Sequence, residues 1–149
     1  MSKKHNPSFL SLVEEAKTRI PEVTVDQVLK MQSDGTNFVM VDVREESEWV
    51  AGHIEGATHL GKGIIERDIE KTIPDKDTVI VLYCGGGFRS ALAAESLHRM
   101  GFRNSVSMDG GWGRNSAAPG GMSDLTAHVC VQCGGQFTVQ HSGGGPARA

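Results

Sequence analysis

Two stretches of the chain are apolar at nearly every position and are short enough to be single strands. Residues 37–43 read NFVMVDV, and residues 78–83 read TVIVLY. Continuous, β-branched apolar runs of this length are typical of strands that are buried on both faces of a parallel sheet. Residues 105–108 predict a further short strand, and a turn-forming sequence follows it at residues 109–111.

Apolar positions recur at helical spacing in other segments of the chain. Residues 8–18 and residues 90–100 each place apolar side chains on one side of a helix, and Gly101 favours an end to the second helix. Thr24 is a suitable N-cap for another helix, which we expect to end at Asp34-Gly35. The alternation of buried strands with helices predicts an α/β fold with a mainly parallel sheet.

The size and charge of the chain limit the classes of function. Its 149 residues, of which 38% are hydrophobic, suit one globular domain with little room for a second. The formal net charge of −3 provides no basic excess for binding nucleic acid, although one local positive site is enough to bind a small anion. No apolar run approaches the ~20 residues of a membrane span, and no signal-type stretch is present. We therefore expect a cytoplasmic protein that has no membrane partner.

The segment of residues 83–90 carries the strongest indication of chemistry. A predicted buried strand delivers Cys84 to the carboxyl end of the sheet, where ligands bind in open α/β folds. The residues that follow are Gly85, Gly86, Gly87, Phe88, Arg89 and Ser90. Unpaired backbone N–H groups in a glycine loop at the start of a helix, with an arginine beside them, form a cradle for an anion. The segment thus predicts that Cys84 is a thiolate nucleophile that acts on an anionic substrate.

Two observations bear on the alternative that Cys84 is only a structural residue. A cysteine after a buried strand is, taken alone, usually a small buried hydrophobic side chain. The strand, the glycine loop, the arginine and the helix together favour a functional site. The chain holds only three cysteines and no export signal, so thiol chemistry or metal binding is a better expectation than a disulfide framework.

Four stretches of the sequence resemble, in order and spacing, the motifs of rhodanese-like domains. The loop CGGGFRS at residues 84–90 resembles the active-site loop of this family. Residues 42–57, which contain DVRE, GHI and GA, resemble its first signature, and DGGW at residues 109–112 resembles its C-terminal signature. Residues 21–28 resemble the strand and helix with which such domains begin. The resemblance covers roughly residues 20–112.

The resemblance implies a rhodanese-like α/β fold, with a five-stranded, mostly parallel sheet and helices on both faces. It implies a sulfurtransferase in which Cys84 accepts the outer sulfur of a small anionic donor such as thiosulfate. The resulting persulfide would pass this sulfur to cyanide, to a thiol or to a protein acceptor. The loop from Gly85 to Ser90, with the Arg89 side chain, would hold the anions. The resemblance implies neither a cofactor nor a metal.

Four residues outside the loop belong to the same motifs. We expect Asp42 and Arg44 to orient the loop through hydrogen bonds or an ion pair, because an ionised nucleophile requires no proton transfer from them. His53 could be a general base, but its place in the motif favours a hydrogen bond that ties down the loop after the first strand. Trp112 is expected to be a core anchor beneath the site.

Two other functions stay open alongside sulfur transfer. A phosphatase or arsenate reductase relative would use a loop one residue longer, whereas Arg89 lies five positions after Cys84. A non-catalytic binding or regulatory module of the same fold often lacks the nucleophile, which this chain has. The length of the loop and the presence of the cysteine both favour a sulfurtransferase.

The predicted domain covers residues 20–116, between an N-terminal helical extension at residues 1–19 and an irregular, flexible tail at residues 117–149. The tail contains four side chains that can bind metal, namely His128, Cys130, Cys133 and His141. The two cysteines have the spacing of a zinc knuckle, and they could instead form a dithiol that reduces the persulfide. We favour a third interpretation, in which these thiols are incidental.

Overall fold

The computed structural model describes residues 5–54 and 56–112, together with the backbone of three short strands further along the chain. These strands are β7 (Val129–Cys130), β8 (Gly135–Gln136) and β9 (Val139–His141). The predicted limits of the domain and of the tail stay predictions. His128 and Cys133, and the side chains of Cys130 and His141, lie outside the described part of the chain.

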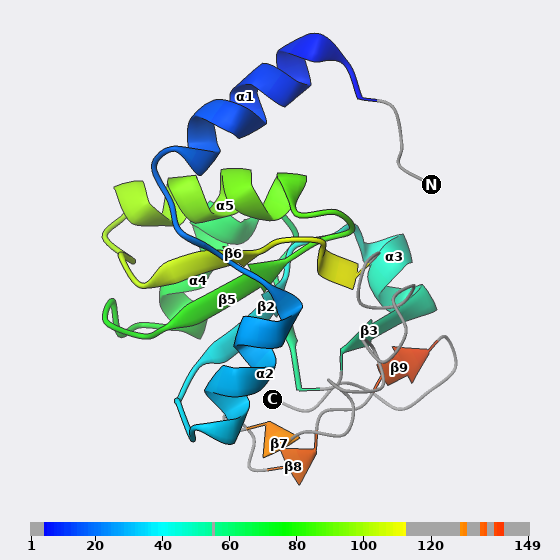
Figure 1. The fold of residues 1–149 in the computed structure, drawn as a ribbon, viewed down its shortest axis with the longest axis vertical. Helices are drawn as coiled ribbons and strands as arrows, with labels where there is room; N and C mark the ends of the chain where they lie inside the picture. The colour runs from blue at the N-terminus through cyan, green and yellow to red at the C-terminus, as the bar shows by residue number, and fades with distance from the viewer. Residues whose placement is uncertain (1–4, 55, 113–128, 131–134, 137–138, 142–149) are drawn as a thin grey trace.

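A five-stranded parallel sheet forms the centre of the fold (Figure 1). Its strands are β1 (Glu22–Val23), β2 (Val39–Asp42), β4 (Thr58–His59), β5 (Ile80–Tyr83) and β6 (Ser105–Met108). They are ordered β1-β6-β5-β2-β4, and every pair is parallel. Asp42 lies opposite Tyr83 at the carboxyl ends of β2 and β5, so the residues that follow these two strands meet at one edge of the sheet.

Helices cover both faces of this sheet, as the sequence predicts. The helices α4 (Ile65–Thr72) and α5 (Phe88–Arg99) pack on one face, and α1 (Pro7–Lys17) lies on the same side of the sheet. The helices α2 (Val25–Ser33) and α3 (Glu46–Ala51) pack on the other. Alternate side chains of β5 point to opposite faces of the sheet. Leu82 packs in the hydrophobic core beneath α5, and Val81 packs in the second hydrophobic cluster, the core beneath α2. The apolar pattern is continuous because each strand is buried from both sides.

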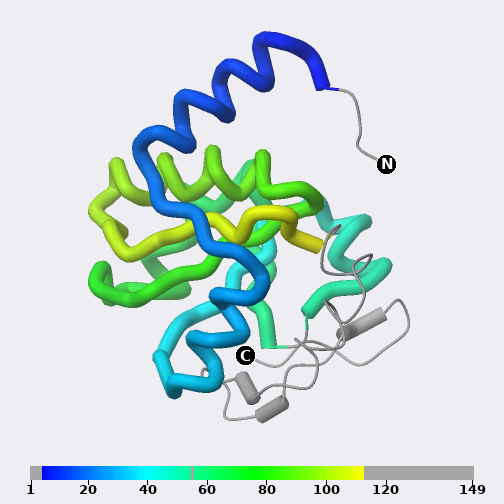
Figure 2. Tube along the Cα trace, viewed as in Figure 1, coloured from blue at the N-terminus to red at the C-terminus, as the bar shows by residue number. Residues whose placement is uncertain are grey.

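The helix α1 lies outside α5 rather than directly on the sheet (Figure 2). Its two fully buried side chains, Val13 and Ala16, are three residues apart and face the domain. The next helix, α2, starts after Thr24, whose hydroxyl accepts a hydrogen bond of 3.1 Å from the amide of Gln27. The Gln27 side-chain oxygen accepts a hydrogen bond of 2.8 Å from the Thr24 amide, so the predicted N-cap is confirmed as part of a capping box.

The boundaries of the elements differ by one or two residues from those that the sequence predicts. The strands β2 and β5 each begin two residues later than the apolar runs, because sheet pairing, and not hydrophobicity, defines their ends. The helix α5 begins at Phe88 and not at Ser90. Gly87 has a φ of 93°, which lets the chain turn from the loop into the helix within one residue.

Two small antiparallel pairs complete the described backbone. The strand β3 (Gly52–Ile54) pairs with β9, and β7 pairs with β8. Within the described residues, no helix is both long and apolar enough to cross a membrane.

Candidate active site

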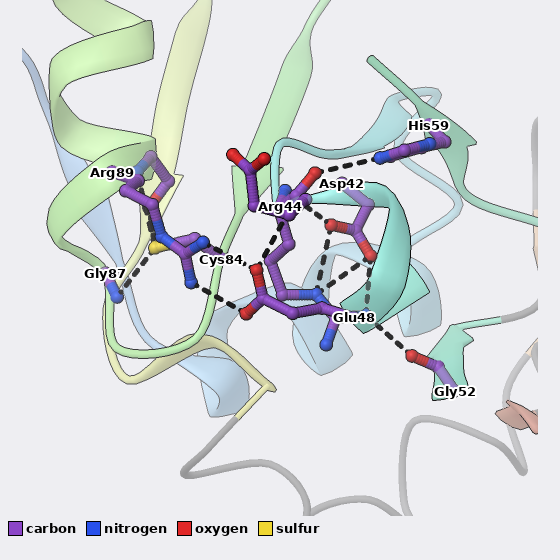
Figure 3. A network of polar contacts seen from close by, with 10 residues as sticks. Asp42, Arg44, Glu48, Gly52, His59, Cys84, Gly87 and Arg89 are labelled. Carbon is purple, nitrogen blue, oxygen red and sulfur yellow. Dashed lines mark hydrogen bonds and ion pairs between the residues drawn. The ribbon is translucent and has the colours of Figure 1, made fainter. Parts of the chain in front are cut away.

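Cys84 directly follows the central strand β5, and its side chain is 1% exposed. Its sulfur atom accepts a hydrogen bond from the amide of Gly87 at 3.1 Å and another from the amide of Ser90 at 3.3 Å (Figure 3). Both amides belong to the loop and to the first turn of α5, where backbone N–H groups have no partner within the helix. The structure therefore forms the cradle of N–H groups around Cys84 that the sequence predicts.

A pair of hydroxyl groups extends this cradle into the sheet. The Ser90 hydroxyl oxygen lies 3.5 Å from the Cys84 sulfur and 2.7 Å from the hydroxyl of Ser107. Ser107 is fully buried on β6, the strand next to β5. The sequence places Ser107 in a strand but gives it no part in the site. Its only signal is that a hydroxyl side chain stands in a strand with apolar neighbours, which is too common to identify a partner.

Arg89 does not stand as an isolated positive charge beside the cysteine. Its guanidinium donates to both carboxylate oxygens of Glu48, at 2.7 Å and 3.0 Å, and the two side chains are 30% and 35% exposed. Such bidentate pairs are among the stronger charge-assisted hydrogen bonds. This bond to Arg89 lowers the pKa of Glu48 to about 2, so the carboxylate is ionised at neutral pH. The ion pair also raises the pKa of Arg89, with a smaller contribution from Cys84.

The sequence does not assign a role to Glu48. It belongs to the first signature and lies in the first turn of α3, where it also accepts a hydrogen bond of 2.9 Å from the amide of Glu45. An acidic residue in the first turn is favourable for any helix, so this position does not by itself indicate a partner. Figure 3 shows Glu48 between the side chains of Arg89 and Arg44.

Asp42 and Arg44 form a buried ion pair at the carboxyl end of β2. The Arg44 guanidinium donates to the Asp42 carboxylate at 2.8 Å and to the carbonyl of Gly52 at 2.6 Å. The carboxylate also accepts a bond of 2.8 Å from the Arg44 backbone amide. The two side chains are 0% and 4% exposed, and neither forms a hydrogen bond to residues 85–90. They fix the junction between β2, α3 and β3 next to the loop.

His53 packs against the indole of Trp49. The two rings are parallel with centroids 3.4 Å apart, and His53 Nδ1 donates to the Trp49 carbonyl at 2.9 Å. Its Nε2 is buried without a hydrogen-bond partner among the described residues, and burial lowers the pKa of His53. His53 forms no hydrogen bond with Cys84. The hydrogen bond from His53 to Trp49 is of the structural kind that the motif suggests, and it joins β3 to α3.

The C-terminal signature lies directly behind the cysteine. The amide of Trp112 donates a hydrogen bond of 2.6 Å to the Cys84 carbonyl. A β-carbon on Gly111 would overlap with the same carbonyl, and Gly111 has a φ of 48°. The partly buried Trp112 ring contacts the second hydrophobic cluster, and the Arg44 guanidinium lies 4.8 Å from its centroid. Trp112 thus links the buried ion pair to the backbone of Cys84.

The remaining loop residues either lie near the surface or contact the N-terminal segment that carries α1. Gly86 is exposed and a β-carbon there would meet no atom within 4 Å, whereas Gly85 is partly buried beside Arg89. The Phe88 ring lies 4.7 Å from the ring of His5 and 6.1 Å from that of Phe9, with both distances between centroids. The Phe88 side chain therefore packs against His5 and the helix α1, and only its backbone takes part in the loop around Cys84.

No metal centre is found among the residues that the structure describes. They contain no group of three or more histidine, cysteine, aspartate or glutamate side chains that could hold a metal ion. Within residues 5–54 and 56–112, the groups gathered around Cys84 are backbone amides, two hydroxyls and the Arg89–Glu48 pair.

Known proteins resemble this chain over the same region. Residues 24–117 match the Rhodanese-like domain family. Thiosulfate sulfurtransferase GlpE of Pseudomonas entomophila is 37% identical over 90 residues, which cover 60% of this chain and 79% of GlpE. GlpE of Pseudomonas putida strain F1 is 38% identical over 94 residues, which cover 63% of this chain and 80% of that protein.

Solved structures with the same fold differ in what their descriptions say of function. A Rhodopseudomonas palustris protein of unknown function, described as a possible tyrosine phosphatase, superposes with a TM-score of 0.66 at 27% identity over 80% of this chain and 98% of that one. A thiosulfate sulfurtransferase of Pseudomonas aeruginosa has a TM-score of 0.58 at 28% identity, over 66% of this chain and 19% of that longer one. The fold, the ordered motifs and these matches agree, and the chain belongs to the rhodanese-like domain family.

Proposed function

We propose that this protein is a sulfurtransferase that carries a sulfane sulfur as a persulfide on Cys84. The observation that carries the proposal is the convergence of the Gly87 and Ser90 amides on the Cys84 sulfur. Hydrogen-bond donors that point at a sulfur atom stabilise its anionic form, which is the nucleophile in thiol chemistry. The same donors would stabilise negative charge on the outer sulfur of a persulfide.

The proposed reaction has two displacement steps. The Cys84 thiolate attacks the outer sulfur of thiosulfate, the sulfur–sulfur bond of the donor breaks, and sulfite leaves with the bonding electron pair. The product is Cys84–S–S⁻, and no oxidant or reductant is consumed. Cyanide or a thiolate then attacks the outer sulfur, which releases Cys84 as a thiolate again. The natural acceptor would be a small thiol or a protein that carries one.

We infer that a donor reaches the cysteine at the tip of the glycine loop. Cys84 itself is 1% exposed, but Gly86 is exposed and the loop there carries no side chain. A donor can approach closely only where the backbone lacks a β-carbon. The attack then needs a small movement of the loop or a donor with a narrow reactive end, which a terminal sulfur atom provides.

A phosphatase is the second candidate, because one structural relative is described as a possible tyrosine phosphatase. Two features favour sulfur transfer. Arg89 lies five positions after Cys84, which gives a loop shorter than that of the related phosphatases. The Arg89 guanidinium is also occupied by Glu48, whereas a tetrahedral phosphate dianion would need that guanidinium for itself.

The proposal is tested by steady-state assays on wild type and Cys84→Ser, with thiosulfate and cyanide in one assay and an aryl phosphate in the other. We expect thiocyanate formation by wild type and none by the variant, because a hydroxyl cannot hold the transferred sulfur. Equal thiocyanate formation by the two proteins would refute the role of Cys84. Hydrolysis of the aryl phosphate that depends on Cys84, without thiocyanate formation, would favour the phosphatase.

A further inference from the structure

The charges next to Cys84 are balanced, although the glycine loop and its arginine suggest a positive site. Arg89 is the charged residue of the loop, and both oxygens of the Glu48 carboxylate bind its guanidinium. Arg44, the other arginine near Glu48, is held by the buried carboxylate of Asp42. Each of these two cations therefore has its own anion, and the backbone N–H groups remain as the uncompensated positive groups of the cradle.

This balance changes which donor the site should bind. Thiosulfate carries two negative charges, and sulfite leaves with two. A guanidinium that is neutralised by a carboxylate attracts such a dianion weakly, and the dianion must also displace Glu48 or approach it closely. A persulfide R–S–SH carries at most one negative charge, has its reactive sulfur at a narrow end and needs no free guanidinium.

We propose that Glu48 determines the specificity of the site, and that it does so by neutralising Arg89 so that persulfides of the form R–S–SH are better sulfur donors than thiosulfate. This inference rests on the proposed sulfurtransferase function. In the transfer, Cys84–S⁻ attacks the outer sulfur of R–S–SH, the donor S–S bond breaks, and R–S⁻ leaves. The products are Cys84–S–SH and R–S⁻, so charge and atoms balance without a further reactant.

The position of Glu48 allows it to be substituted without disturbing the hydrophobic core. Its carboxylate is 35% exposed, so the pair with Arg89 is not part of a sealed core. A glutamine at this position can still accept the hydrogen bond from the Glu45 amide and can place its carbonyl oxygen near Arg89. Glu46 lies two residues earlier in α3, is exposed, and provides a matched change of one charge on the same helix.

The experiment compares wild type, Glu48→Gln and Glu46→Gln with two donors, thiosulfate and an alkyl persulfide without other charged groups. For thiosulfate, we expect Glu48→Gln to raise kcat/KM about tenfold, mainly through a lower KM, because the guanidinium is no longer neutralised. For the alkyl persulfide, kcat/KM should rise by a clearly smaller factor in the same variant, because this donor carries less negative charge. Glu46→Gln should stay within about twofold of wild type for both donors.

A binding measurement keeps the test independent of turnover. Inorganic sulfate, a dianion, is titrated as a protectant of Cys84 against alkylation by iodoacetamide. The protecting concentration should fall about tenfold in Glu48→Gln and stay unchanged in Glu46→Gln. Glu48→Ala, which also removes the charge, replaces Glu48→Gln if thermal unfolding shows that the glutamine variant is not folded.

Two results would overturn the inference. One is an unchanged or higher KM for thiosulfate in the Glu48 variants together with unchanged protection by sulfate. The other is an equal gain for both donors, which would indicate a general change in reactivity and not in charge selection. Failure of the proposed function looks different: wild-type Cys84 would then take up sulfur from neither donor, while the sulfate titration would still report whether Glu48 repels dianions.

Discussion

The backbone amide of Trp112 donates a hydrogen bond of 2.6 Å to the carbonyl oxygen of Cys84. This contact joins the C-terminal signature to the residue from which the glycine loop starts. Gly111 lies so close to the same carbonyl that a β-carbon would overlap with it. The position of Cys84 thus depends on Gly111 and Trp112, which lie 27 and 28 residues further along the chain.

The first prediction concerns this close approach. Gly111→Ala should destabilise the protein by about 2 kcal/mol or more, because it adds both an overlap with Cys84 and an unfavourable left-handed backbone. Gly86→Ala is the control, since a β-carbon there meets no atom within 4 Å and its φ is not positive. We expect the control to stay within about 0.5 kcal/mol of wild type in urea unfolding. Equal destabilisation by both substitutions would contradict the role of Gly111.

The second prediction concerns the hydroxyl of Ser107. Its bond to the Ser90 hydroxyl should strengthen the contact between Ser90 and the Cys84 sulfur, since linked hydrogen bonds polarise one another. Ser107→Ala should slow alkylation of Cys84 at neutral pH about two- to threefold. Ser105→Ala removes a buried hydroxyl from the same strand, one that donates to the Phe102 carbonyl at 3.0 Å. That control should leave the alkylation rate unchanged, and a similar slowing in both variants would rule out a specific contribution from Ser107.

The third prediction concerns the buried ion pair between Asp42 and Arg44. Asp42→Asn should lower the free energy of unfolding by about 3 kcal/mol or more, because it leaves the Arg44 charge buried without a counter-ion. The pair between Arg67 and Asp68, whose arginine side chain is 74% exposed, provides the comparison, and Asp68→Asn should cost much less stability than Asp42→Asn. Urea unfolding at neutral pH measures both. A small loss for Asp42→Asn would mean that Arg44 finds another partner or reaches solvent.

The fourth prediction concerns pH and His53. Burial lowers the pKa of His53 in the folded protein below the 6.5 of the free side chain, so the unfolded chain binds a proton more readily. Its contribution to stability is therefore complete above pH 6.5 and is lost as pH falls through the lower, folded-state pKa. His53→Phe, which keeps a ring beside Trp49, should flatten the decline in unfolding free energy between about pH 7.5 and 5. An equally steep decline in the variant would assign the pH dependence to other groups.

The parts of the fold and site that could be predicted are those in which neighbouring residues carry the signal. The strands β2 and β5 are continuous apolar runs, and the loop from Cys84 to Ser90 is contiguous, so pattern and chain order were enough. The pairing of Arg89 with Glu48 was not predictable, because the two residues are 41 positions apart. Their contact depends on β2 and β5 being neighbours in the sheet, which periodicity does not specify.

The same reason explains why Ser107 was missed and why the expected positive charge at the loop is compensated. Ser107 reaches Ser90 only because β6 lies next to β5. A local sequence motif shows which cations are present but not which distant carboxylates bind them. The sequence places Arg89 close to Cys84 in the chain, whereas its electrostatic effect depends on Glu48 in α3.

The most direct test of the sulfurtransferase proposal is the intact mass of the protein after incubation with a sulfur donor. Wild type and Cys84→Ala are each treated with thiosulfate and with an alkyl persulfide, and half of each sample then receives cyanide. We predict that wild type gains the mass of one sulfur atom and loses it again with cyanide, while Cys84→Ala gains none. A wild-type mass that is unchanged with both donors, or an equal gain on Cys84→Ala, would contradict the assignment of Cys84 as the sulfur carrier.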